Sequence, residues 1–387
     1  MIFKPIFWQL RAPMHHGPCA RPVIRAILCV MKQEIPEAAA AESVDKAIES
    51  NRLESTGELY AALDLGTNNC RLLIARPSFQ QHTQHKTLKV VDSYSRIVRL
   101  GEGVSDTGRL GEEAMRRTMR ALSTCKQKLN RYGIAKYRFV ATEACRRASN
   151  AESFLNRVRD ELGLTIDIIS NEEEARLAFL GCSSLLMKDT SYALAFDIGG
   201  GSTEFMWVKI DPEQPLNSHK RHLIQDWVSL PYGVMNMSEQ FGGPAFTEMY
   251  FEEIVAKISS LLTPMERDNQ IAARMWKEDV QMLSTSGTVT TLAAIHLDLP
   301  HYDRSKIDGI KLSISDIRGA TQTLMRMSPA ARAAHPCIGS SRTDFILSGC
   351  AIFEAIARTF PIDKITIADR GVREGIIVSL MREVIPA

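Results

Sequence analysis

The sequence predicts an α/β protein made of two related halves with a cleft between them. After about residue 60, short apolar runs that end at turn residues alternate with helical patterns. The same order of patterns starts again after about residue 190, so the second half repeats the first. Chains that alternate strands with helices form α/β sheets, and the junction between two such halves is a common place for a ligand.

The first half is predicted to begin with three strands, because its first apolar runs are short and end at turn residues. A helical segment rich in Arg, Met, Leu and Lys follows, and Phe154, Val158 and Leu162 share one face of a later predicted helix. The strands are expected at 60–66, 71–75, 89–100, 137–142 and 164–169, and the helices at 111–132, 151–162 and 172–186.

The second half is predicted to start in the same way, with a buried strand that runs into a glycine turn. Asp64 aligns with Asp197 and Gly66 with Gly199, each pair being 133 positions apart. This spacing is about the length of one domain and indicates an internal duplication. Strands are expected at 192–199, 204–210, 222–230, 280–285 and 364–368, and helices at 246–263, 288–296, 313–326, 342–359 and 371–384.

Composition excludes several classes of protein. Hydrophobic residues make up 45% and charged residues 24% of the 387 residues, which excludes a disordered chain, a collagen and a disulfide miniprotein. The net charge of +2 requires that any polyanion bind to a local basic patch. No run of about 18 uncharged apolar residues is present, so no membrane span is expected.

The eight cysteines form no C-x-x-C pair, so no zinc site is expected. Isolated thiols in a long chain are typical of a reducing compartment, where they pack as small apolar residues. These features predict a cytoplasmic protein.

Residues 1–57 lack the pattern of the rest of the chain. Residues 1–31 carry four basic and no acidic residues, which is only weakly similar to a transit peptide. A secretory signal is not predicted, because the apolar segment 23–31 is interrupted by Arg25. We expect either a disordered extension or an upstream start codon with Met31 as the true start.

Two Asp-Gly turns are the first candidates for chemistry. Glycine lets backbone N–H groups approach an anion, and the neighbouring aspartate can hold Mg²⁺ or orient water. One copy would be explained as an ordinary hairpin turn, whereas two copies at domain spacing favour a site. The strongest local motif is Asp197-Ile-Gly-Gly-Gly-Ser-Thr-Glu204, which suits a phosphate chain. It is neither a Walker A loop nor a dinucleotide fingerprint, because no G-K-[ST] follows and a strand comes next.

Three further segments carry charged or hydroxyl groups. Ser286-Gly-Thr288 is predicted to begin a helix, where it could bind an anion or serve only as an N-cap. Arg146 follows the end of a predicted strand, where it could contact phosphate or begin a solvated helix. In the acidic run at 172–174, Glu172 and Glu173 can reach Arg176, but Glu174 faces away from it. Glu174 is therefore predicted to lack a local cation, as suits a general base.

Together these segments resemble the exopolyphosphatase / guanosine pentaphosphate phosphatase family of the actin-like ATPase superfamily. The matching stretches occur in family order over nearly all of 58–387, and the Gly-Gly-Gly-Ser-Thr-Glu and Glu-Glu-Ala-Arg motifs together are specific to this family. The resemblance implies two actin-like (ribonuclease H-like) domains at about 58–190 and 191–387. It implies hydrolysis of the terminal phosphate of inorganic polyphosphate with Mg²⁺, and it allows K⁺ as a further ion and a homodimer.

The resemblance also implies roles for individual residues. Glu174 would be the base that activates water, and Glu204 would help to position water or metal. Asp64, Asp197 and Glu204 would lie at the metal. The residues that would hold phosphates are Thr67, Asn68, Arg146, Gly199, Gly200, Gly201, Ser202, Thr203, Ser286, Gly287, Thr288 and Arg373. No nucleic acid and no membrane is expected as a partner.

Other functions stay open from the sequence. Guanosine pentaphosphate could be the substrate of the same site. A regulator that binds an alarmone or nucleotide without turnover is an alternative of another class, although Glu174, Glu204 and Asp197 are intact. An actin-like kinase or filament protein is the third alternative, and the Glu-Glu-Ala-Arg run argues against it.

Overall fold

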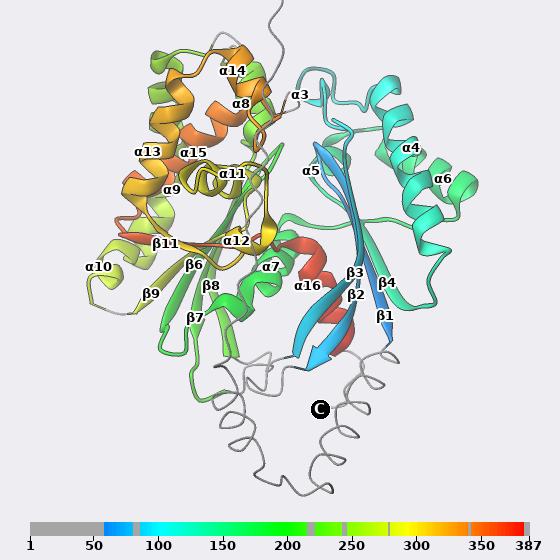
Figure 1. Cartoon of the computed structure of the whole chain (residues 1–387), viewed down its shortest axis with the longest axis horizontal. Helices are drawn as coiled ribbons and strands as arrows, with labels where there is room; N and C mark the ends of the chain where they lie inside the picture. The colour runs from blue at the N-terminus through cyan, green and yellow to red at the C-terminus, as the bar shows by residue number, and fades with distance from the viewer. Residues whose placement is uncertain are drawn as a thin grey trace, which may run out of the picture. The chain divides into compact units, whose positions relative to one another are not determined.

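Two mixed β-sheets organise the part of the chain that the structure, a computed structural model, describes (Figure 1). The described residues are 58–79, 86–214, 221–241, 246–277, 279–339 and 342–382. The predicted N-terminal extension at 1–57 lies outside them. By contacts, residues 58–387 form one compact unit.

The first sheet has the strand order β3-β2-β1-β4-β5. Its strands are β1 (Leu59–Leu65), β2 (Asn69–Phe79), β3 (Lys86–Ile97), β4 (Ile134–Ala141) and β5 (Asp167–Ile168). The first three strands are antiparallel, and β4 pairs parallel with β1. Only two residues of the strand predicted at 164–169 form ladder pairs, because Leu164 and Ile166 pack into the core before β5 begins.

The second sheet has the strand order β10-β11-β9-β6-β7-β8. Its strands are β6 (Tyr192–Ile198), β7 (Thr203–Ile210), β8 (His222–Leu230), β9 (Val280–Ser284), β10 (Lys311–Ser313) and β11 (Lys364–Ile367). Strands β6, β7 and β8 are antiparallel, and β9 pairs parallel with β6. The structure therefore confirms the predicted repetition of a three-stranded meander followed by alternating helices and strands, and it shows that a parallel strand is added to each meander.

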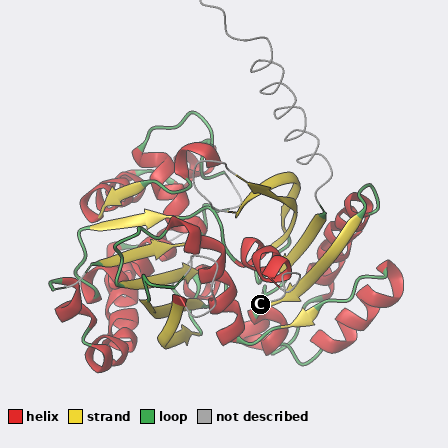
Figure 2. Ribbon diagram, turned by 90° about the horizontal axis from the view of Figure 1, so that it is seen from below, coloured by secondary structure: helices red, strands yellow, loops and turns green. Residues whose placement is uncertain are grey.

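Helices flank both sheets (Figure 2). The first half contains α3 (Val104–Thr107), α4 (Glu112–Leu129), α5 (Glu143–Arg147), α6 (Ala151–Leu162), α7 (Asn171–Cys182) and the 3₁₀ turn η1 (Ser183–Leu185). The second half contains α8 (Val234–Gln240), α9 (Glu248–Asn269), α10 (Ile271–Met275), α11 (Gly287–His296), α12 (Arg304–Ile307), α13 (Ile314–Arg326), α14 (Pro329–Ala334), α15 (Ile346–Thr359) and α16 (Val372–Arg382). The longer helices match the predictions, whereas the short helices α3, α5, α8, α10, α12 and α14 were not predicted.

The two faces of the first sheet bury different helices, as the period-2 alternation of a strand requires. Leu63 and Leu65 of β1 pack against α4 and α6, while Tyr60 and Ala62 face α7 and α16. Helix α7 also packs against the second sheet through Ala175 and other apolar residues, so it contacts both sheets.

Helix α16 lies in the range predicted for the second domain but packs against the first sheet. The predicted division at residue 190 stays a prediction, but it does not describe the packing of this helix. A helix whose apolar face is known can still bury that face against either sheet, and the sequence does not say which. As a result, α7 and α16 lie against each other beside the junction of the two halves (Figure 1).

The crossing of α7 and α16 depends on glycine. A Cβ on Gly375 would overlap the carbonyl group of Leu177, and a Cβ on Gly181 would overlap the carbonyl group of Gly371. Both obstacles are backbone, so they cannot move away as a flexible side chain could. The two helices can therefore approach this closely only with glycine at both positions.

We expect Gly375→Ala to destabilise the fold by about 2 kcal/mol or more, because the added methyl overpacks a backbone contact. Gly319→Ala is the matched control, since Gly319 is an exposed residue of α13 with open space at its Cβ position. That control should stabilise the protein by about 0.5–1 kcal/mol. Urea unfolding measures both changes, and equal stability of the two variants would contradict the packing assigned to α7 and α16.

The helices in the described ranges include none that is long and apolar enough to cross a bilayer. The described cysteines are free and buried, as expected for thiols that pack as apolar residues: Cys70, Cys125, Cys145, Cys182, Cys337 and Cys350. Cys19 and Cys29 lie outside the described residues.

Candidate active site

The two Asp-Gly turns face each other across one cavity of about 110 Å³. The first turn connects β1 to β2, and the second connects β6 to β7. The lining residues of the first sheet are Asp64, Gly66, Thr67, Asn68, Asn69 and Arg71. Those of the second turn are Asp197, Ile198, Gly199, Gly200, Gly201 and Ser202. Further lining comes from Thr142, Glu143, Glu174, Val234, Thr285, Gly287, Thr288, Arg342, Phe345, Ile346 and Val372.

Backbone hydrogen bonds from residues outside the cavity fix the first turn. The Asn68 carbonyl accepts hydrogen bonds from the N–H groups of Val98 (2.8 Å) and Arg99 (3.0 Å), and the Thr67 carbonyl accepts one from Gly101 (2.9 Å). The side-chain oxygen of Asn68 is buried and has no hydrogen-bond partner among the described groups. A buried polar oxygen without a partner is costly, so this atom is suited to bind a ligand or water.

The second turn is held in the same way. The carbonyls of Gly199 and Gly200 accept the N–H groups of Val234 (2.9 Å) and Met235 (2.8 Å). A Cβ on Gly201 would lie 2.8 Å from the Thr67 hydroxyl. At Gly201 the two turns therefore pack too closely for a Cβ unless Thr67 moves, a contact that the sequence pattern alone did not show.

Glu174 lies in the first turn of α7, where Ser170 caps the helix by accepting the Glu173 N–H. Its Oε2 lies 2.8 Å from Nη2 of Arg146, whose guanidinium is also 2.9 Å from Glu143. This corrects the prediction that Glu174 lacks a cation. Arg176 indeed pairs with Glu173 at 3.8 Å instead, but a second arginine reaches Glu174 from α5.

The predicted role of Arg146 changes accordingly. Arg146 also donates to the Ile169 carbonyl at 2.9 Å, so its donors are engaged by protein groups. It stands behind Glu143 and Glu174 and does not line the cavity. A direct phosphate contact by Arg146 is therefore not supported by this structure.

Three other predicted residues also lie behind the cavity wall. The Thr203 hydroxyl donates to the Tyr232 carbonyl at 2.7 Å, and Thr203 is fully buried. The Ser286 hydroxyl donates to the Ile198 carbonyl at 3.2 Å and caps α11 by accepting the Thr288 N–H. Arg373 lies 3.9 Å from Glu374 and is not a lining residue. The Thr203 and Ser286 hydroxyls are thus already satisfied by carbonyl acceptors. The phosphate contacts of Thr203, Ser286 and Arg373 stay predictions, and none of the three residues lines this cavity.

The remaining predicted phosphate residues are brought together at the cavity: Thr67, Asn68, Gly199, Gly200, Gly201, Ser202, Gly287 and Thr288. Gly287 and Thr288 form the first residues of the ten-residue helix α11. The N–H groups and dipole of a helix N-terminus favour an anion. The sequence expectation that these segments converge is confirmed.

Burial shifts the pKa values of the carboxyl groups at the site upward. Burial raises the pKa of Asp64 and of Asp197, and Arg71 partly offsets both shifts. Burial, together with the charge of Glu204, raises the pKa of Glu174 well above its usual range. Glu204 faces Asp197 in the β6–β7 register, and burial raises its pKa to about 7.

Glu204 does not line the main cavity. It lines a smaller cavity together with Asp197 and Thr285, and its Oε1 accepts a hydrogen bond from the Ser229 hydroxyl at 3.1 Å. The predicted metal set of Asp64, Asp197 and Glu204 is therefore not one cluster. No group of three or more His, Cys, Asp or Glu side chains in the described ranges could enclose a metal ion.

Asp64 and Asp197 nevertheless fit a magnesium ion. Mg²⁺ is usually held by one or two carboxylates together with water and substrate phosphates, so a closed protein cage is not needed. The two aspartates line the same cavity from opposite turns. Burial raises the pKa of both, so a bound cation would favour their charged forms.

Sequence reasoning missed three charged cavity residues, namely Arg71, Arg342 and Glu143. Arg71 faces Asp64 in the β1–β2 register, as Glu204 faces Asp197 in the β6–β7 register. Applying the 133-residue offset to Glu204 would therefore have found Arg71. Arg342 has no counterpart in the first half. Glu143 lies three residues before Arg146, the one residue of that segment for which a role was predicted.

The two arginines supply the local positive patch that a polyanion requires. Burial and the nearby Arg71 lower the pKa of Arg342, which donates to the Thr291 hydroxyl at 2.9 Å. Arg71 forms no ion pair within 4.0 Å to any other residue that the structure describes. Guanidinium groups without a carboxylate partner are suited to bidentate contact with phosphate.

The raised pKa of Glu204 predicts a pH dependence of stability. A carboxyl whose pKa is higher in the folded than in the unfolded state stabilises the fold at low pH, and this contribution is lost as pH rises through about 7. Glu204→Gln should remove this loss, which we place on the order of 2 kcal/mol. Urea unfolding at pH 5 and pH 8 measures it. If the free energy of unfolding falls by the same amount between pH 5 and pH 8 in the variant and in the parent protein, the raised pKa assigned to Glu204 is wrong.

Comparisons with known proteins find similarity over most of the chain. The model of the Ppx/GppA phosphatase family matches residues 79–384. The chain is 30% identical over 333 residues to Exopolyphosphatase 2 of Mycobacterium tuberculosis, a match that covers 83% of this chain and 98% of that protein.

Solved structures show the same similarity. The structure of the Aquifex aeolicus member of the Ppx/GppA protein family is 29% identical, with a TM-score of 0.68 over 85% of this chain and 99% of that one. An exopolyphosphatase structure from Cytophaga hutchinsonii is 23% identical, with a TM-score of 0.70 over 85% and 99% of the two chains, and shows the same fold.

Proposed function

The chain belongs to the Ppx/GppA phosphatase family, and from this premise we propose that it hydrolyses the terminal phosphate of inorganic polyphosphate. Its two mixed sheets form the actin-like fold that the sequence predicted. The observation that carries the proposal is the composition of the cavity, where two arginines and two glycine turns meet buried carboxylates. The name of the similar Mycobacterium tuberculosis protein supports polyphosphate as the substrate class.

The phosphates of the chain end would be bound by positive charge and by N–H groups. Arg71 and Arg342 neutralise the phosphate oxygens, and the first residues of α11 add a favourable dipole. Phosphoryl transfer needs mainly positioning and charge neutralisation, which this arrangement provides. None of these groups reads a base or a sugar, as suits a repetitive polyanion.

Glu174 would act on the attacking water. Its carboxylate accepts a proton from the water as the water oxygen bonds to the terminal phosphorus and the bridging P–O bond breaks. The shortened chain leaves with the electron pair of that bond. Arg146 holds the Glu174 carboxylate in place, and the raised pKa of Glu174 makes it a stronger base than an exposed glutamate.

Asp64 and Asp197 would hold Mg²⁺. When bound, the ion neutralises charge on the phosphate oxygens. K⁺ and a homodimer, which the family resemblance allows, remain expectations.

Guanosine pentaphosphate is the second candidate substrate. Phe345, an aromatic residue packed in the core of the second half, is among the lining residues and could contact a base. The remaining contacts with its 5′ phosphates would be those described for polyphosphate.

Side-by-side initial rates test the proposal. The full chain is incubated with Mg²⁺ and either long-chain polyphosphate or guanosine pentaphosphate, and orthophosphate is measured. We expect release from polyphosphate that EDTA abolishes and that excess Mg²⁺ restores. Faster release from guanosine pentaphosphate would favour the second candidate, and binding of either compound without release would indicate a regulator.

A further inference from the structure

One ion pair joins the two halves through segments that both reach the cavity. Arg99 lies in the loop after β3 of the first half, and Asp344 lies in the turn before α15 of the second half. Nη2 of Arg99 is 3.6 Å from Oδ2 of Asp344, and both side chains are partly exposed. Among the described residues, neither side chain forms another ion pair within 4.0 Å. The pair therefore attaches these two segments to each other.

The backbone around Arg99 fixes the first Asp-Gly turn of the cavity. The Arg99 N–H donates to the Asn68 carbonyl at 3.0 Å, and the Gly101 N–H donates to the Thr67 carbonyl at 2.9 Å. The contact is close, because a Cβ on Gly101 would overlap the Thr67 side chain. Thr67 and Asn68 both line the cavity. The position of Arg99 is thus coupled to residues that are expected to bind phosphate.

Arg99 has an unusual backbone conformation. Its φ is 48°, in the left-handed region that residues other than glycine, asparagine and aspartate rarely adopt. Such a conformation persists only where the surrounding structure enforces it, and it occurs often at functional sites. Glycine would adopt this φ without steric cost. The presence of an arginine at this position therefore points to a role for its side chain.

The partner of Arg99 belongs to the turn that carries Arg342. Arg342 and Phe345, which flank Asp344 in the sequence, both line the cavity. The Asp344 carbonyl accepts the Ser238 hydroxyl of α8 at 2.6 Å, and the Arg342 carbonyl accepts the Phe345 N–H at 3.2 Å. These hydrogen bonds come from the second half itself. Among the described ion pairs, the pair with Arg99 is the one that attaches this turn to the first half.

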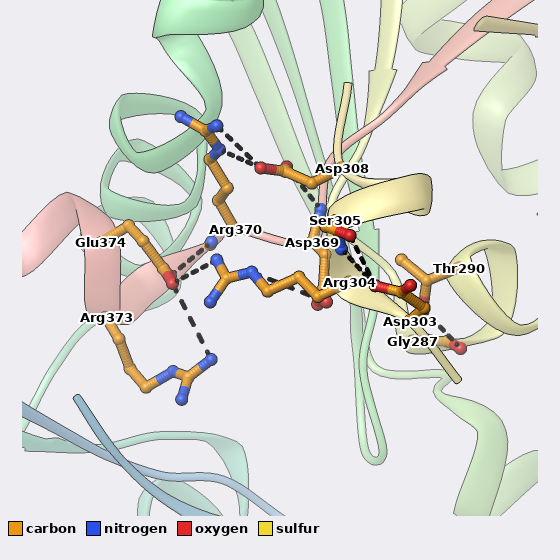
Figure 3. A network of polar contacts seen from close by, with 11 residues as sticks. Gly287, Thr290, Asp303, Arg304, Ser305, Asp308, Asp369, Arg370, Arg373 and Glu374 are labelled. Atoms are coloured by element: carbon orange, nitrogen blue, oxygen red, sulfur yellow. Dashed lines mark hydrogen bonds and ion pairs between the residues drawn. The ribbon is translucent and has the colours of Figure 1, made fainter. Parts of the chain in front are cut away.

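Another ion pair between the halves has a different setting (Figure 3). Nη2 of Arg304 on α12 lies 2.9 Å from Oε1 of Glu374 on α16, and Glu374 is buried. Helix α12 packs in the second half through Ile307, whereas α16 packs against the first sheet. Neither Arg304 nor Glu374 lines the cavity. This buried pair is suited to hold the halves together, whereas the pair of Arg99 and Asp344 joins segments that line the cavity.

On the basis of the proposed function, we infer that Arg99 is a positioning residue for polyphosphate binding. Through Asp344 it joins the turn of Thr67 and Asn68 to the turn of Arg342, so that phosphate-binding groups of both halves are in place before the substrate binds. Arg99 itself does not line the cavity. Without the ion pair, the Arg342 turn loses its attachment to the first half, and binding of the phosphate chain must then order it at a cost in affinity.

Asp344→Asn is the most informative variant, because simple charge attraction predicts the opposite result. If Asp344 acted only through its charge, removing a negative charge near the cavity would favour a polyanion and lower KM. If Asp344 positions the Arg342 turn, KM for polyphosphate should rise about three- to fivefold, as expected for an exposed ion pair, while kcat changes less. Arg99→Ala should raise KM by a similar factor.

The double variant tests whether the two residues act as a pair. In Arg99→Ala the Asp344 carboxylate has no partner, so adding Asp344→Asn should cause no further rise in KM. Arg157→Ala is the matched control, because Arg157 forms an exposed ion pair with Glu161 (2.6 Å) within α6, outside the cavity lining. It should leave KM near the parent value, and thermal unfolding checks that each variant is folded. A KM for Asp344→Asn at or below the parent value overturns the inference, as do additive increases in the double variant.

Two measurements need no turnover and so separate this inference from the proposed function. Hydrogen–deuterium exchange at 342–346 should be faster in Arg99→Ala than in the parent chain, although the substitution lies in the other half. Calorimetric binding of tripolyphosphate in EDTA should be weaker for Asp344→Asn than for the parent chain, even if no substrate is hydrolysed. Unchanged exchange or equal binding overturns only the inference. If the parent chain neither binds nor hydrolyses polyphosphate, both are overturned.

Discussion

Replacing Glu174 by Gln should lower kcat for phosphate release from polyphosphate by about 100- to 10,000-fold, the range expected for loss of a general base. The amide has almost the same shape as the carboxylate but cannot accept a proton from water. The fold should be retained, because burial raises the pKa of Glu174 and so already opposes its charge. Initial rates and circular dichroism of the purified variant measure the two effects.

Glu172→Gln is the matched control for this experiment. Glu172 lies in the same first turn of α7 but is exposed and does not line the cavity. Its substitution should leave kcat unchanged. The limb of the pH–rate profile that depends on Glu174 should also disappear in Glu174→Gln. Parent-like turnover in Glu174→Gln would remove Glu174 as the base, and Glu143→Gln would then be the next variant to measure.

Arg71→Ala should reduce kcat/KM for polyphosphate by about 100-fold, mainly through KM, because the variant loses a cavity-lining guanidinium that we propose binds phosphate. Arg71 also offsets the charge of Asp64 and Asp197, so its loss leaves two buried carboxylates facing the polyanion. Arg71→Lys should recover only part of the affinity, since a lysine cannot make a bidentate contact. Initial rates over a range of polyphosphate concentrations measure KM.

The control for Arg71 is Arg96→Ala. Arg96 is an exposed residue of the neighbouring strand β3, opposite Cys70, and is not part of the cavity. Arg96 carries the same charge as Arg71. The Arg96→Ala variant therefore shows how much the loss of any one positive charge on the protein raises KM for a polyanion. Equal KM values for Arg71→Ala and Arg96→Ala would show that Arg71 does not bind substrate.

The sequence predicts the repeated architecture well, because the repetition is local. Each meander is encoded by short apolar runs and an Asp-Gly turn, and the offset between Asp64 and Asp197 relates the two halves. Since both turns are at the same end of equivalent strands, their convergence on one cavity also follows. The same offset identifies Arg71 as the counterpart of Glu204, so this residue could have been predicted.

Contacts between distant segments could not be predicted in this way. Arg146 pairs with Glu174 because α5 brings it beneath α7, and no periodicity in either segment encodes that approach. Arg342 reaches the cavity from the turn before α15, without a counterpart in the first half. The packing of α16 against the first sheet likewise depends on tertiary structure, since its apolar residues fit either sheet.

The central claim is that the chain removes phosphate from the end of polyphosphate, and ³¹P NMR of long-chain polyphosphate tests it most directly. This method separates free orthophosphate, terminal phosphates and internal phosphates in one sample with Mg²⁺. Removal of terminal phosphates should produce orthophosphate at the expense of the internal signal, while the terminal signal stays constant because each shortened chain keeps two ends. A rising terminal signal without orthophosphate, or no change at all, would contradict the account.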